Sequence, residues 1–184
     1  MKPLRYHFAL RILHWLIAAL ILTALILGTW VMAPADPADP GKAFALLKHM
    51  MAGGLILVLT LTRLFIRPKT RRPAPALSGI AAVDRLIPVV HRIFDVMALI
   101  MVGSGIVLAA VNHLHDIVPG IVFGGHGQLP SSYHGHLIHL LHVGTARLLA
   151  AIVALHVAGA LYHQFILRDG LFTRMALVGR GNRS

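Results

Sequence analysis

Four long apolar stretches constrain the fold of this chain more than any other feature of its sequence. They run from about Phe8 to Met32, from about Ala43 to Ile66, from about Leu86 to Val111 and from about Leu137 to Leu167. Each is long enough to cross a hydrocarbon core of about 30 Å as a helix that rises about 1.5 Å per residue. Only 12% of the residues are charged, against about 25% in soluble domains. The sequence therefore predicts an all-α, integral membrane four-helix bundle in a single membrane domain, residues 1–184.

The connections between these stretches are marked by proline and glycine. Residues 33–41 contain three prolines, which cannot continue a helix, and residues 68–75 are rich in proline and arginine. The segment from Asn112 to Ser132 contains glycine and histidine without a helical period, and we expect an irregular loop there. The first apolar stretch is too long for the core of a cleaved signal peptide and lacks a small-residue cleavage site.

The distribution of lysine and arginine predicts the orientation of the bundle. Basic residues gather in the N-terminal tail, in the connection between the second and third stretches and in the C-terminal tail. The positive-inside rule then places both termini of this multi-pass chain on the cytoplasmic side of the membrane. A net charge of +11 is often a sign of nucleic-acid binding. Here the basic residues flank apolar spans, so we expect the lipid bilayer and no nucleic acid as partner.

Histidine is the chemically distinctive residue of this chain. The sequence has 13 His and no Cys, which excludes disulfides, Cys-ligated iron–sulfur clusters and covalent c-type haem. An ionisable side chain inside a membrane span is costly unless it is paired or liganded. His142 and His156 lie fourteen residues apart on the fourth stretch, so they share a helix face at a separation of about 21 Å. This spacing suits two haems stacked across the membrane, each taking one of these side chains as an axial ligand.

The depth of the other histidines predicts the partner of each ligand. His49 lies at a depth similar to that of His142 in the outer half of the membrane, and His14 lies in the inner half with His156. Depth alone matches His14 to His163 at least as well, but His142 and His163 are about 31 Å apart, which would move the haems to the two surfaces. Three nearby glycines would allow either the close approach of a flat macrocycle or ordinary helix packing. They are Gly53, Gly54 and Gly144.

Several other polar residues lie near the inner surface. His91, Arg92 and Asp95, together with His163, are candidates for a quinone site. Asp95 follows Arg92 by one turn, so the simpler interpretation is an interfacial ion pair of little energetic value. Arg63 and Arg67 are explained by topology more simply than by haem propionates.

Three motifs together resemble the prokaryotic cytochrome b561 family. They are the segment Arg11–Trp15, which reads Arg-Ile-Leu-His-Trp, the apolar run from His49 to Arg63, and the series His142, His156 and His163. The resemblance extends over about residues 6–175. It implies a membrane cytochrome with two b haems per chain that relays electrons between a periplasmic donor and ubiquinone or another membrane quinone.

By motif, the resemblance implies four axial ligands, and it favours His156 over His163. These ligands are His14, His49, His142 and His156. Some members of the family are similar to superoxide:ubiquinone oxidoreductases. This leaves two activities open, an enzyme of that type and a pure electron carrier.

The outer loop leaves the donor unidentified and keeps other functions open. A site for the superoxide anion should be electropositive, but the long outer loop has no lysine or arginine and instead carries His113, His115, His126, His134 and His136. The first two and the last two form candidate pairs for a divalent metal. The alternative functions are a haem-carrying membrane subunit of a larger dehydrogenase or hydrogenase complex, and a His-rich divalent-metal transporter or binding protein.

Overall fold

The computed structural model describes residues 5–33, 35–36, 39–71, 73, 81–124, 129–168 and 170–177. Over these residues the regular structure is entirely helical, with no strand. Four helices are long and apolar enough to cross a membrane, and they confirm the four predicted stretches. These spans are Phe8–Met32, Gly41–Lys69, Val89–Val111 and His136–Leu167.

The long helices include short ends with different hydrogen bonding. In chain order they are α1 (Phe8–Ile26) with the π-helical η1 (Leu27–Met32), α2 (Pro40–Ile66) with the 3₁₀ turn η2 (Arg67–Lys69), α3 (Ala81–Val111), and α5 (His136–Tyr162) with the π-helical η3 (His163–Leu167). α2 begins three residues earlier than expected because the Asp39 carboxylate accepts a hydrogen bond from the Gly41 N–H at 2.8 Å. A proline at the first helical position also suits this start. α3 begins about five residues earlier than expected.

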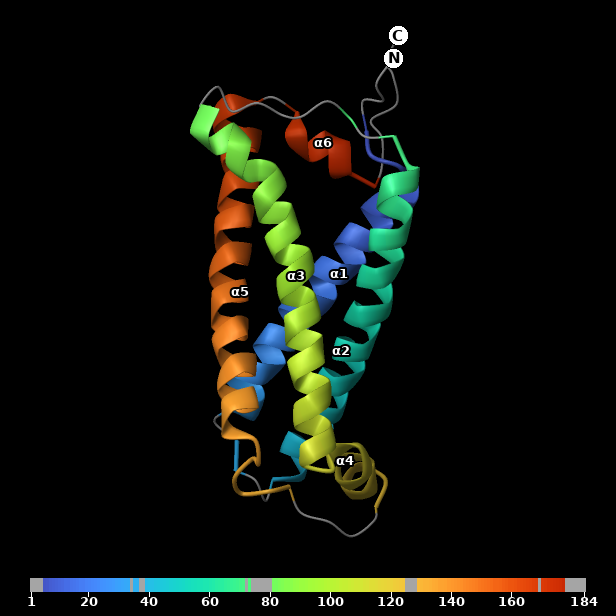
Figure 1. Cartoon of the computed structure of the whole chain (residues 1–184), viewed down its shortest axis with the longest axis vertical. Helices are drawn as coiled ribbons and strands as arrows, with labels where there is room; N and C mark the ends of the chain where they lie inside the picture. Colours follow the sequence, from blue (N-terminus) through green and yellow to red (C-terminus); the bar gives the residue numbers. More distant parts are fainter. Residues whose placement is uncertain are drawn as a thin grey trace.

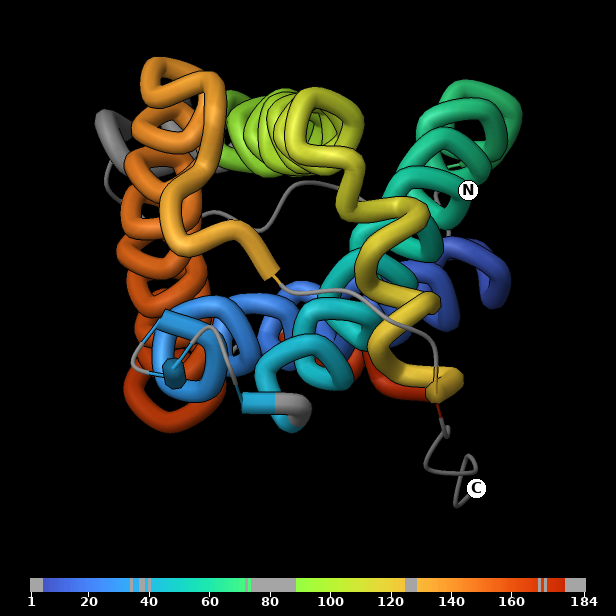
Figure 2. Tube along the Cα trace, turned by 90° about the horizontal axis from the view of Figure 1, so that it is seen from below, coloured from blue at the N-terminus to red at the C-terminus, as the bar shows by residue number. Residues whose placement is uncertain are grey.

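The four long helices run around a common axis (Figures 1 and 2). α1 packs mainly on α2, and α3 packs mainly on α5, while α2 also contacts α3. The short helix α6 (Leu171–Met175) lies at the end of the bundle where α1 begins and α2 finishes, and α4 (Leu114–Val122) lies at the opposite end (Figure 1). We call these the α6 end and the α4 end.

At the α6 end, hydrogen bonds join the two ends of the described chain. The Arg11 guanidinium donates to the Ala176 carbonyl, and the Trp15 indole N–H donates to the Met175 carbonyl at 2.9 Å. These bonds tie the segment after α6 to the first turns of α1. The start of α1 and the segment after α6, which are distant in sequence, therefore lie together at the α6 end of the bundle.

The prediction of an irregular loop from Asn112 to Ser132 is wrong, because α4 forms inside it. Leu114 and Val118 are buried, and they pack with Ala43 and Leu46 of α2 in one apolar cluster. The spacing of four residues puts both side chains on one face of a helix. The glycine, proline and histidine around them hid this short amphipathic pattern.

Asn112 fixes the beginning of this connection to its end. Its amide is buried and donates to the Leu108 carbonyl at 2.9 Å and to the His134 carbonyl at 3.1 Å, and it accepts from the His134 N–H at 2.7 Å. One side chain thus satisfies three backbone groups. The last turn of α3 and the approach to α5 are held together at the α4 end.

Candidate functional site

Two pairs of histidine rings meet between the helices. His49 of α2 lies against His142 of α5, with ring centroids 6.1 Å apart. His14 of α1 lies against His156 of α5, with ring centroids 6.3 Å apart. The structure therefore brings His49 together with His142, and it places His156 beside His14, where depth alone left His163 as an alternative.

The separation within each pair matches the geometry of a shared metal ion. A bond from an imidazole nitrogen to a metal is about 2 Å long, and the ring centre lies about 1 Å beyond the nitrogen, so two imidazoles on opposite sides of one metal have centroids about 6 Å apart. Both pairs have this spacing. The residues present fit an iron bound between two axial imidazoles at each pair.

A fourteen-residue register relates the two pairs on all four long helices. It joins His14 to Gly28, His49 to Arg63, His91 to Gly105 and His142 to His156. Fourteen residues are about 21 Å of helix and return to nearly the same face. The bundle thus has two levels, each with one position from every long helix.

The two levels differ in the residues that accompany each histidine pair. The α4 level consists of Gly28, His49, Gly105 and His142, and the α6 level consists of His14, Arg63, His91 and His156. Glycines stand beside the pair at the α4 level. An arginine and a third histidine stand beside the pair at the α6 level.

Hydrogen bonds hold both rings of the α4 level. His49 Nδ1 lies 3.1 Å from the Ala24 carbonyl oxygen, and His142 Nδ1 lies 3.0 Å from the Ser104 hydroxyl oxygen. The Ser104 hydroxyl in turn donates to the Met101 carbonyl at 3.0 Å. In both rings the Nδ1 atom faces an acceptor, which leaves Nε2 as the nitrogen available to a metal.

Two glycines let helix backbones approach these rings. A Cβ atom at Gly105 would lie 3.2 Å from His142 Cε1, and a Cβ atom at Gly28 would lie 3.6 Å from His49 Cε1. The three glycines singled out from the sequence have a different environment. A Cβ atom at Gly53, Gly54 or Gly144 would meet no described atom within 4 Å, so open space lies beside them.

Aromatic rings surround the pair at the α6 level. His156 has the His91 ring at 5.9 Å and the Phe94 ring at 5.3 Å, both in edge-to-face contact. The Trp15 ring lies 5.3 Å from His14. Sequence analysis missed Phe94, although it follows His91 by three residues and therefore shares a helix face with it.

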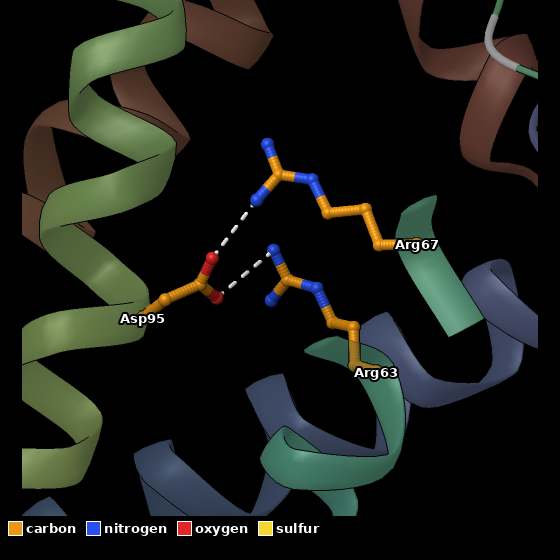
Figure 3. A network of polar contacts seen from close by, with 3 residues as sticks. All are labelled: Arg63, Arg67 and Asp95. Atoms are coloured by element: carbon orange, nitrogen blue, oxygen red, sulfur yellow. Dashed lines mark hydrogen bonds and ion pairs between the residues drawn. The ribbon is translucent and has the colours of Figure 1, made fainter. Parts of the chain in front are cut away.

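Asp95 of α3 joins Arg63 of α2 and Arg67 of η2 (Figure 3). Its carboxylate lies 2.9 Å from Arg67 and 3.4 Å from Arg63. The expected pairing with Arg92 is wrong, because the buried Asp95 points to α2 while Arg92 is exposed. Arg63 is also the α2 member of the α6 level, which it shares with His14 and His156.

His163 occupies a separate position from the two pairs. It is the first residue of η3, it is buried, and its ring lies 6.3 Å from the Tyr162 ring. The ring that the structure places beside His14 belongs to His156. His163 lies seven residues further toward the α6 end.

The histidines of the outer connection do not gather into a metal centre in the part of the chain that is described. His113 and His115 have ring centroids 6.2 Å apart. Over the described residues, no three His, Asp, Glu or Cys side chains come together as a metal site. The predicted pair His134 and His136 is exposed, and His126 lies outside the described residues.

Comparisons with known proteins match a family over nearly the whole chain. The family described as prokaryotic cytochrome b561 matches residues 5–176, which include every helix of the structure. A curated relative from Yersinia pestis, named "Probable superoxide oxidase CybB", is 25% identical over 177 residues. The alignment covers 92% of this chain and 94% of the relative.

Proposed function

Because this chain belongs to the prokaryotic cytochrome b561 family, we propose that it holds two b haems and relays electrons between a donor outside the cytoplasm and the quinone pool. Membership and the four spanning helices make it a multi-pass membrane electron-transfer cytochrome, and the family implies haem b. The observation that carries the proposal is the separation of 6.1 and 6.3 Å within the two histidine pairs. One iron fits between the rings of each pair.

His49 with His142 at the α4 level and His14 with His156 at the α6 level would hold the two haems. Haem would supply one-electron iron chemistry. All four of these residues are imidazoles, a ligand set that would suit electron transfer rather than oxygen binding.

The α6 end faces the cytoplasm in this proposal. Described basic residues concentrate there, whereas the opposite end carries Lys42 and Lys48. The positive-inside rule then places the α4 end on the periplasmic side of the inner membrane. Electrons enter at the α4 level and leave at the α6 level.

The quinone side of the relay lies near the α6 level. A quinone takes up two electrons and two protons, so its site needs groups that can carry protons. His163 and His91 are suitable because an imidazole ring has one nitrogen that can donate a hydrogen and one that can accept it. Both lie on the cytoplasmic half of their helices in the proposed orientation.

Superoxide is the donor suggested by the name of the relative. The test is to mix the oxidised protein with a superoxide-generating system and to follow the haem absorption bands. We expect reduction that superoxide dismutase abolishes. Absence of any reduction by superoxide, in a protein whose haems dithionite reduces, would reject this donor.

Single substitutions test the ligands. We expect His142→Ala and His156→Ala each to lose about half of the bound haem, because each removes one iron ligand at a different level. His139→Ala, on the same helix as His142 and one turn away, is the matched control and should keep both haems. Loss of haem in His163→Ala together with full haem in His156→Ala would overturn the assignment.

A further inference from the structure

The hydrogen bonds at the α4 level fix the position of a proton on each ring. A carbonyl oxygen can only accept, so His49 Nδ1 must carry the proton that it shares with Ala24 at 3.1 Å. The Ser104 hydroxyl has a single proton, which it donates to the Met101 carbonyl at 3.0 Å. Its oxygen therefore accepts from His142 Nδ1, 3.0 Å away, and the Met101 carbonyl is a second acceptor for the same ring. Both rings are held in the tautomer whose Nε2 lone pair is free.

Donation of a hydrogen bond from Nδ1 also changes the basicity of the imidazole as a ligand of iron. An imidazole that donates its second N–H to an acceptor becomes a more basic ligand. A more basic ligand stabilises the ferric state over the ferrous state, which lowers the reduction potential. Ser104 is buried, so water does not compete for this bond.

The surroundings of the α6 level favour a higher reduction potential. Over the described residues, the structure records no hydrogen bond to the ring nitrogens of His14 or His156, whose neighbours are aromatic rings. An arginine side chain stays charged in proteins, and Arg63 belongs to the α6 level together with His14 and His156. A positive charge near an iron in a low dielectric favours the state that holds one more electron.

We propose that these unequal surroundings give the haem at the α4 level a lower reduction potential than the haem at the α6 level, with Ser104 as a positioning residue that acts through His142. The inference rests on the proposed axial ligation. One electron leaves the iron at the α4 level, which is oxidised, and enters the iron at the α6 level, which is reduced, and no bond forms or breaks. The outer donor is the reductant, and a membrane quinone is the oxidant. Electron transfer from the haem on the periplasmic side to the haem on the cytoplasmic side is therefore energetically favourable.

A redox titration of the purified protein followed by visible absorption tests the role of Ser104. We expect Ser104→Ala to shift the equilibrium between ferrous and ferric iron in the lower-potential haem about threefold to tenfold toward the ferrous state. For one electron, this makes the reduction potential about 30 to 59 mV more positive. Ser104→Thr keeps the hydroxyl and should restore the original value. Thr62→Ala is the matched control, because the exposed Thr62 hydroxyl donates to the Val58 carbonyl of its own helix at 2.8 Å.

Arg63→Gln provides the second arm of the experiment. Removal of this charge should make the potential of the higher-potential haem more negative and leave the other haem unchanged. The proposal is overturned if Ser104→Ala, with both haems bound, shifts neither potential or shifts the higher one. Haem content is measured first on every variant. A wild-type protein without two haems would reject the proposed function instead, so the two failures are distinguishable.

Discussion

The position and the tautomer of the His142 ring depend on two neighbouring residues of α3. Gly105 allows the backbone of α3 to approach within van der Waals distance of the ring, and Ser104 accepts the Nδ1 proton. These adjacent residues fix the position and the tautomer of one side chain. At this scale, the candidate site is as much a property of α3 as of the helix that carries His142.

Gly105→Ala should weaken the α4-level haem site. The new Cβ atom would lie 3.2 Å from His142 Cε1, and relieving such overpacking costs about 1–3 kcal/mol, or about fivefold or more in haem affinity. Haem titration of the stripped protein measures the effect. Gly103→Ala is the control on the same helix, since its Cβ atom would meet no described atom within 4 Å. Equal affinities in the two variants would contradict the close approach at Gly105.

At the scale of elements, α2 and α3 are held together near the α6 end by buried charge rather than by apolar packing alone. Asp95 of α3 is 7% exposed and binds both Arg63 of α2 and Arg67 of the adjoining turn η2. The carboxylate offsets the cost of bringing one of these guanidinium groups into the bundle.

Asp95→Asn should destabilise the protein by about 2–3 kcal/mol. Removal of one partner from a fully buried pair costs about 3–5 kcal/mol, and the side chains of Arg63 and Arg67 retain 17% and 26% exposure, which reduces the loss. Thermal unfolding in detergent at constant haem content gives the comparison. Asp116→Asn is the control, because that carboxylate is 75% exposed. If both variants unfold at the wild-type temperature, the ion pairs do not hold α2 to α3.

Elements with a strong periodic or apolar signal could be predicted from the sequence. The four spans are continuous apolar runs, so their existence did not depend on tertiary contacts. α4 escaped prediction because only its contacts with α2 bury Leu114 and Val118, and its composition resembles that of a loop. The early start of α2 depends on a cap at Asp39 that the prolines around it concealed.

The candidate site could be predicted only as far as its histidines. The spacing of His142 and His156 is visible in one helix and indicates two levels. The identity of the residues beside each ring depends on how separate helices face one another, which single-helix periodicity does not contain. Ser104 in particular has no signal of its own, since a serine in a membrane helix commonly bonds to its own backbone.

At the scale of the whole molecule, the two ends of the bundle are chemically distinct. The α6 end gathers basic residues and the contacts of Arg11 and Trp15 with the segment after α6, whereas α4 covers the opposite end. This polarity gives the relay a direction if the charge distribution also sets the orientation in the membrane. The orientation of the chain in the membrane therefore determines the direction of the proposed electron relay.

A cysteine-labelling experiment tests this orientation, because the natural chain has no cysteine. We expect Ser132→Cys to react with a membrane-impermeant maleimide added to spheroplasts, and Thr173→Cys to react only after the membrane is broken. Both positions are exposed, uncharged and at opposite ends of the bundle. The reverse pattern would place the α6 end in the periplasm and would invert the proposed direction of electron flow.

The most direct test of the whole account is a reduced-minus-oxidised absorption spectrum of the purified protein, combined with haem quantification per chain. The paired imidazoles at two levels predict a b-type, bis-histidine spectrum and two haems in each chain. A colourless protein from cells with ample iron and porphyrin, or a single haem per chain, would contradict it.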